Sequence, residues 1–253
     1  MVIGGWLSLL AVCVHVDLGH RRGAAANRGT ARQLGRHTEH SELEAWTFEV
    51  QAWQALLDGK YREAVELCQA GLKVADSHTS AAVQLTAQEA RAWARLGDAK
   101  QTHATLDRSA GMVGHLPPPT QPHHHFVFDP HKLTSYAATT LAWLGDSQEA
   151  EPYAREVIRY YEEEAGPDEA PRRLATARID LALVVAQEER PEEASHLGNL
   201  ALESGRLVPS NIWRAAELDR VLSDRYRDLL EVRDYHERFV EVEWAVIHGR
   251  RAK

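Results

Sequence analysis

One helix-turn-helix corner recurs along the chain, and this repeat restricts the possible folds more than any other feature. Five aligned corners centre on residues 19, 59, 97, 145 and 189, with spacings of 40, 38, 48 and 44 residues. Four of these corner residues are glycine, which supplies the left-handed backbone that ends a helix. A sixth corner is expected at 232–235. Each corner predicts a pair of antiparallel helices.

Small residues flank the five corners at fixed distances. Seven residues before each corner the chain has Val12, Ala52, Ala90, Ala138 and Ala182. Five residues after each corner it has Ala24, Ala64, Thr102, Ala150 and Ala194. Two helices approach closely only where the side chains between them are small, so these positions predict the crossing point of each pair. Asp98 and Asp146, which each follow a corner glycine, are expected to cap the second helix of their pairs.

The pattern resembles the tetratricopeptide repeat, and 58–67 is its best match. The resemblance implies an all-α fold of about six helical hairpins stacked in a right-handed superhelix. The spacings exceed the usual length of about 34 residues, and the last two corners lack glycine. We expect one domain over 1–253, with repeats at 5–38, 40–78, 79–112, 130–165, 171–204 and 210–248. A Pro- and His-rich insertion loop is expected at 113–129.

Helical periodicity without any alternating strand pattern supports this fold class. The helices are expected at 5–18, 22–34, 40–57, 60–75, 79–96, 99–112, 130–144, 147–164, 171–188, 191–204, 210–231 and 234–248.

The charge balance excludes some partners. Lys and Arg number 29 and Asp and Glu number 37, which gives a net charge of −8. A surface that grips nucleic acid or an anionic membrane normally has the opposite sign, so we expect neither partner. The two cysteines, Cys13 and Cys68, show no metal-type spacing and are expected to be buried, reduced thiols of a cytoplasmic protein. The apolar start of the chain lacks a preceding basic residue and is interrupted early, so we interpret it as a first helix.

No motif indicates catalysis or a cofactor. The chain has no phosphate-binding glycine loop, no Cys-x-x-Cys and no His-Glu-x-x-His, so we expect no enzyme, no cofactor and no metal. The remote alternative is a metal-dependent enzyme that uses the consecutive residues His123, His124 and His125, although no carboxylate or cysteine completes that set. The neighbouring Phe126 and Phe128 are expected either to anchor the loop to the core or to line a ligand groove.

The repeat resemblance implies a concave groove lined by the first helix of each pair. The candidate ligand-binding residues, placed by their distance from the corners, are Glu49, Trp53, Gln84, Arg91, Arg95, Lys132, Ser135, Thr139 and Trp143. Arg91, Arg95 and Lys132 are expected to form a cationic patch without carboxylates, which predicts an acidic peptide or protein as the ligand.

A narrower resemblance rests on 45–53, 124–130 and 143–146, which look like the C-terminal sensor region of actinobacterial Xre-type helix-turn-helix transcriptional regulators. It implies a regulatory, ligand-sensing module that works with a DNA-binding domain or a protein partner. The first repeat starts almost at Met1, so we expect a sensor region without its DNA-binding domain. It is expected to be a fragment, a family member without that domain, or the product of a gene whose start is misassigned. The alternative is a passive scaffold between two proteins.

Overall fold

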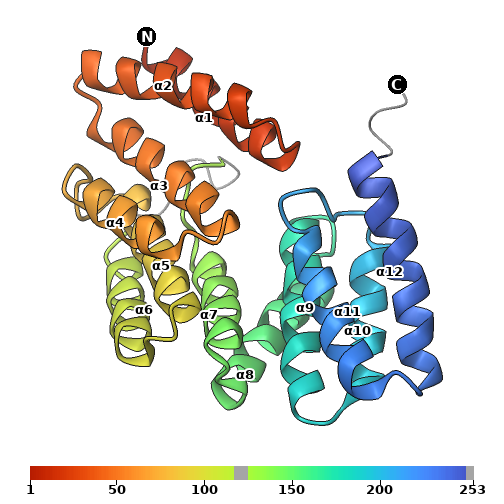
Figure 1. Ribbon diagram of the computed structural model, residues 1–253. Helices are drawn as coiled ribbons and strands as arrows, with labels where there is room; N and C mark the ends of the chain where they lie inside the picture. Colours follow the sequence, from red (N-terminus) through yellow and green to blue (C-terminus); the bar gives the residue numbers. More distant parts are fainter. Residues whose placement is uncertain (117–124, 249–253) are drawn as a thin grey trace. The chain divides into compact units, whose positions relative to one another are not determined.

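In the computed structural model, residues 1–116 and 125–248 are described, and all regular structure in these ranges is helical (Figure 1). The α-helices are α1 Val2–Asp17, α2 Arg21–His37, α3 Ser41–Leu57, α4 Tyr61–Leu72, α5 Ser80–Arg95, α6 Ala99–Val113, α7 Pro130–Leu144, α8 Ser147–Arg159, α9 Pro171–Gln187, α10 Pro191–Glu203, α11 Ile212–Tyr226 and α12 Leu230–His248. The expected all-α class is therefore confirmed.

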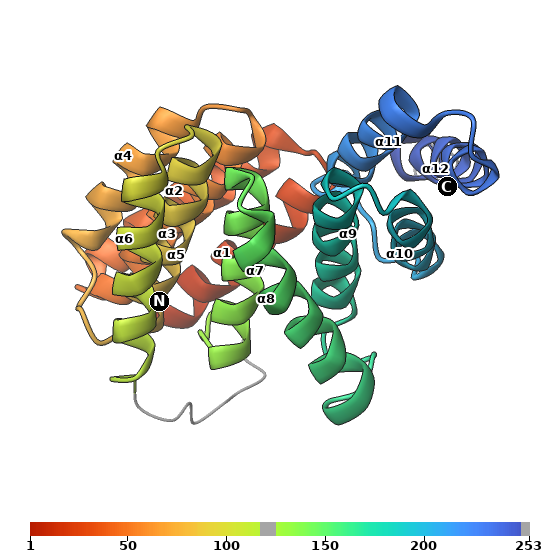
Figure 2. The same ribbon diagram turned by 90° about the horizontal axis from the view of Figure 1, so that it is seen from below.

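The chain divides into two compact units, Met1–Tyr136 and Ala137–Lys253, and the boundary lies inside α7. In the first unit, α1 packs on α2, α3 on α4 and α5 on α6, and the successive hairpins are joined by contacts between α2 and α3 and between α4 and α5. In the second unit, α9 packs on α10 and α11 on α12, as the view in Figure 2 shows. Each unit is thus built from sequential helical hairpins. The sequence did not indicate this division.

The backbone confirms the five corners. The corner residues have positive φ angles of 72° at Gly19, 73° at Gly59, 74° at Gly97, 87° at Gly145 and 61° at Glu189. All ten residues at the flanking small positions are 0% exposed. The repeat pattern therefore marks real helix ends and fully buried small residues.

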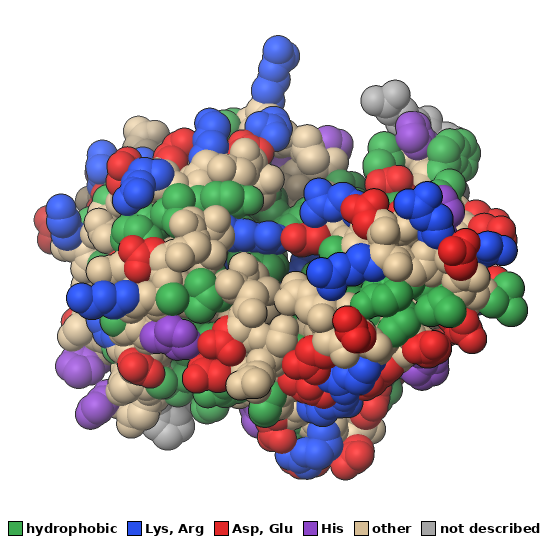
Figure 3. All heavy atoms as spheres, turned by 60° about the horizontal axis from the view of Figure 1, so that its bottom comes forward, with side chains coloured by type: hydrophobic (Ala, Val, Ile, Leu, Met, Phe, Trp, Pro, Cys, Tyr) green, Lys and Arg blue, Asp and Glu red, His purple; other side chains and the backbone are tan. Residues whose placement is uncertain are grey.

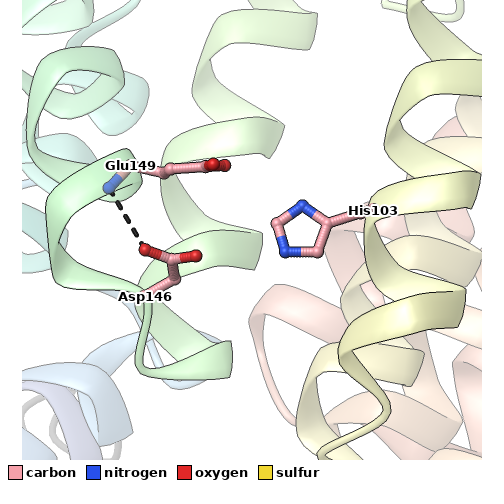
Figure 4. Close-up of side chains that lie close together, drawn as sticks. All are labelled: His103, Asp146 and Glu149. Atoms are coloured by element: carbon pink, nitrogen blue, oxygen red, sulfur yellow. Dashed lines mark hydrogen bonds between the residues drawn. The ribbon is translucent and has the colours of Figure 1, made fainter.

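The expected aspartate caps are also present. The Asp98 carboxylate accepts a hydrogen bond from the Gln101 backbone N–H at 3.0 Å. The Asp146 carboxylate accepts one from the Glu149 backbone N–H at 3.3 Å (Figure 4). His103, also drawn there, belongs to α6 of the first unit. Each aspartate satisfies a backbone donor that has no partner within its helix.

The sixth corner was wrongly placed. α11 already ends at Tyr226 and α12 begins at Leu230, so 232–235 lie within α12. Val232, Tyr235 and Phe239 are buried at helical spacing and form the inner face of α12. The Tyr235 hydroxyl donates to the Ala215 carbonyl oxygen at 3.0 Å, which fixes this face against α11.

The end of α8 also differs from the expected helix. The α-helix stops at Arg159, and Tyr160–Glu164 continue as one π-helical turn. The wider turn buries Tyr161 against Val157, Leu174 and Ala177.

Helix α5 is the most deeply buried helix segment of the first unit, because every residue from 81 to 90 is buried. α3, α4 and α6 all pack on it. Phe128 packs against Val83 and Ala87 of α5, and Phe126 lies between Trp6 and Trp46 with ring centroids 5.3 and 5.2 Å away. Both phenylalanines therefore anchor the chain to the core. Residues 117–124 of the expected insertion loop, with His123 and His124, lie outside the described residues.

Two further findings concern membrane-spanning helices and the cysteines. Within the described ranges, no helix combines the length and the apolar character that crossing a membrane requires. Cys13 and Cys68 are both buried, as expected, and burial raises the pKa of the Cys68 thiol.

The corner geometry predicts opposite effects at two positions. A Cβ added at Gly97 meets nothing within 4 Å, so Gly97→Ala should suffer only from its left-handed backbone and lose about 1 kcal/mol of unfolding free energy. Glu189 already carries that strain, so Glu189→Gly should leave stability equal or slightly higher. Urea unfolding measures both variants. A Gly97→Ala protein as stable as the parent would show that the corner does not need this backbone.

Candidate functional site

A polar cluster lies between α3, α5 and α7 of the first unit. We call it the α5 polar cluster, and it consists of Glu49, Gln84, Gln88, Arg91 and Tyr136. Gln84, Gln88 and Arg91 follow each other at helical spacing, so they share one face of α5. Six of the other thirteen residues of this helix are alanine, which allows the neighbouring helices to approach closely.

Hydrogen bonds connect the members of the cluster. The Gln84 side-chain amide nitrogen donates to Glu49 Oε1 at 3.0 Å and to the Tyr136 hydroxyl oxygen at 2.5 Å. The Arg91 guanidinium donates to Gln88 Oε1 at 3.1 Å, and its central carbon lies 5.0 Å from the centroid of the Tyr136 ring. The cluster thus links three helices through groups whose positions depend on one another.

Burial controls the charges of the cluster. Burial raises the pKa of the Glu49 carboxyl, against the opposing effects of Gln84, Lys132 and Arg91. Burial lowers the pKa of the Arg91 guanidinium and raises the pKa of Tyr136 to about 12. A carboxyl group, a guanidinium and a phenol therefore share a weakly hydrated space, where electrostatic interactions are stronger than in water.

Two buried amide atoms of the cluster have no hydrogen-bond partner among the described residues. They are Gln84 Oε1 and Gln88 Nε2, and their side chains belong to residues that are 6% and 0% exposed. Neither amide can be turned around, because Gln84 must donate to Glu49 and Gln88 must accept from Arg91. A buried polar atom without any partner costs about 1–3 kcal/mol, so a further hydrogen-bonding group beside these two atoms would be favourable.

Several expected groove residues meet at this cluster. Glu49, Gln84 and Arg91 are members of the cluster. The charge of Lys132 acts to lower the pKa of Glu49, and the charge of Arg95 acts to lower the pKa of Arg91. Trp53 is half-buried and packs against the hydrophobic core of the first unit.

The expectation of a cationic patch without carboxylates was wrong. The Glu49 carboxylate lies among the cations and affects the pKa of Arg91. The Lys132 ammonium donates to the Val127 carbonyl oxygen at 2.7 Å, which ties the start of α7 to the segment before it. The Ser135 hydroxyl donates to the His131 carbonyl oxygen of its own helix at 3.0 Å.

Thr139 and Trp143 belong to the second unit, where they join a different cluster. The Thr139 hydroxyl donates to the Asp180 carboxylate at 2.6 Å, and Arg214 forms an ion pair with the same carboxylate. The Arg214 guanidinium carbon lies 5.1 Å from the Trp143 ring and 5.8 Å from the Trp213 ring. Asp180 and Arg214 are 1% and 3% exposed, so this buried pair is internally neutralised.

Sequence reasoning missed Gln88, Tyr136, Asp180, Trp213 and Arg214. A signal was present for Asp180, which stands between Ile179 and the apolar run 181–186 and therefore had to be buried. Gln88 gave a weaker signal, one turn after Gln84 in an alanine-rich helix.

Comparisons with known proteins give no independent indication of function. No protein-family model matches the chain, and no curated protein matches it. Functional inference therefore depends on the geometry of the two clusters.

The raised pKa of Glu49 predicts how stability depends on pH. A carboxyl group whose pKa is raised on folding contributes stability while it is protonated, and this contribution is lost as the pH rises through its folded pKa. Glu49→Gln removes the titration and keeps an acceptor for Gln84. The variant should therefore gain stability relative to the parent as the pH rises above 4.5, the ordinary value of the carboxyl.

Denaturant unfolding at a series of pH values measures this difference. Glu66→Gln, at an exposed position of α4, is the matched control and should show no comparable trend. A difference between Glu49→Gln and the parent that stays constant with pH would contradict the assigned environment.

Proposed function

We propose that the chain is a regulatory peptide- or protein-binding module of the tetratricopeptide type. The unpartnered amide atoms of Gln84 and Gln88 in the α5 polar cluster carry this proposal. The confirmed corners, the buried small positions and the sequential packing of hairpins support the repeat type. The stacking of these hairpins in a superhelix with a concave groove is part of the proposal.

A peptide main chain matches what the cluster lacks. Gln84 Oε1 accepts and Gln88 Nε2 donates, and the two residues are one helical turn apart on the same face. Every peptide unit offers one N–H donor and one C=O acceptor. Because both amides are buried in the free protein, the helices around them must separate before a peptide can reach them. A peptide that then binds both amides would remove the cost of leaving them unpaired, and this gain would add to its affinity.

The regulatory part of the proposal follows from the position of the cluster. It joins α3, α5 and α7, so a ligand that binds there would favour one arrangement of these helices over others. Such coupling between neighbouring hairpins is what a sensor module needs. We propose that the output is control of a transcriptional regulator or partner protein in the cytoplasm.

The proposal predicts that one substitution lowers affinity more than it changes stability. Gln88→Met keeps the size of the side chain and removes an unpaired buried donor, which offsets the loss of the acceptor for Arg91, so the stability of the free protein should change little. Its affinity for peptide should fall about tenfold, which corresponds to one lost hydrogen bond of about 1.4 kcal/mol. Gln101→Met, at an exposed position of α6, is the matched control.

A thermal-shift screen of a random hexapeptide library identifies a ligand, and calorimetric titration then gives the affinity of each variant. The proposal fails if no peptide raises the melting temperature, or if Gln88→Met binds the selected peptide as tightly as the parent.

A further inference from the structure

Helix α2 presents a row of arginines to α3. The helix contains Arg21, Arg22, Arg28, Arg32 and Arg36 and no acidic residue. At the two ends of the row, arginine meets a carboxylate: Arg21 pairs with Asp58 at 2.6 Å and Arg36 with Glu44 at 2.7 Å. The first unit thus neutralises the ends of the row with its own acidic side chains.

The two arginines in the middle have only neutral hydrogen-bond partners, although the Glu44 carboxylate acts on Arg32 through space. Arg28 donates to Gln54 Oε1 at 2.5 Å. Arg32 donates to Thr47 Oγ1 at 3.0 Å and to Gln51 Oε1 at 3.4 Å. Within residues 1–116 and 125–248, neither forms an ion pair with a carboxylate. We call Arg28 and Arg32 the α2 arginine pair.

Leaving the α2 arginine pair without a carboxylate is unfavourable. The two cations are four residues apart on one helix, where like charges repel. Both are half-buried, and burial together with the neighbouring arginine lowers the pKa of each, which Glu44 opposes at Arg32 without reversing the direction. In the second unit, by contrast, Arg155 and Arg190 each pair with two or more glutamates, and Figure 3 shows such intermixed charges on the face drawn.

The α2 arginine pair also retains binding capacity. A guanidinium has five N–H donors, and the bonds above use one donor of Arg28 and two of Arg32. The Arg32 guanidinium carbon lies 4.3 Å from the centroid of the Phe48 ring, which helps to fix the plane of this group. A fixed guanidinium plane favours bidentate binding of a carboxylate.

We propose that the α2 arginine pair binds two carboxylates of an acidic peptide or protein segment. Such a segment would complete the row of ion pairs that Asp58 and Glu44 begin at its ends. Side chains four apart on a helix are about 5–6 Å apart, and alternate side chains of an extended segment are separated by about 7 Å on one face. A Glu-x-Glu sequence therefore fits the pair. This site is separate from the α5 polar cluster and does not depend on the function proposed for it.

Nuclear magnetic resonance titration of the full chain tests the proposal. The probe is the peptide acetyl-Ala-Glu-Ala-Glu-Ala-amide, and its counterpart with both glutamates replaced by glutamine is the control. The glutamate peptide should shift backbone signals of α2 and α3, and the glutamine peptide should not. Arg28→Gln with Arg32→Gln should weaken binding about tenfold or more, whereas Arg21→Gln with Arg22→Gln removes the same charge from α2 and should change affinity about twofold or less.

A second variant places carboxylates of the protein itself beside the α2 arginine pair. Gln51→Glu with Gln54→Glu should raise the melting temperature of the free protein, because each new carboxylate faces an arginine. The same variant should no longer bind the glutamate peptide. The proposal is overturned if the parent does not bind that peptide at millimolar concentration, or if Gln51→Glu with Gln54→Glu binds it unchanged. Equal shifts with inorganic phosphate at the same ionic strength would also overturn the assignment to an acidic segment.

Discussion

The burial of residues 81–90 of α5 is the constraint on which the first unit depends. Its residues 81–90 have no exposed side, so each polar group among them must find a partner within the protein. On one side, Glu89 accepts hydrogen bonds from Gln69, Trp93 and Arg108 and is well satisfied. On the other side, Gln84 and Gln88 bind charged neighbours and still retain one unpartnered atom each. The same helix thus carries both a structural polar network and an incomplete one.

In the second unit, a buried charged group is paired entirely within the unit. Asp180 is buried in an apolar helix, and it is neutralised by Arg214 and hydrogen-bonded by Thr139. The guanidinium is further enclosed by Trp143 and Trp213. A closed pair of this kind contributes to the specificity of packing more than to net stability. Because its charges are paired within the second unit, we propose a structural role for the cluster around Asp180, and the proposed ligand binding concerns the first unit alone.

The five corners and the buried small positions could be predicted from the sequence, because a left-handed corner residue and small flanking side chains are local requirements. The prediction of a sixth corner was wrong. Residues 232–235 lie at the spacing of the repeat, but Val232 and Tyr235 belong to the buried face of α12. The site was predicted in part. Position relative to a corner identified Glu49, Gln84 and Arg91, but the partners Gln88 and Tyr136 depend on how the helices are rotated against each other. The sequence also did not indicate that Glu49, from α3, lies close to the cations of α5 and α7.

The most direct test of the account is a high-resolution crystal structure of the protein bound to a peptide selected by thermal shift. The account predicts that a main-chain N–H of the peptide lies within hydrogen-bond distance of Gln84 Oε1 and that a main-chain carbonyl accepts from Gln88 Nε2. A peptide bound elsewhere, with both amides hydrogen-bonded only to ordered water, would contradict the account and make the α5 polar cluster a structural feature.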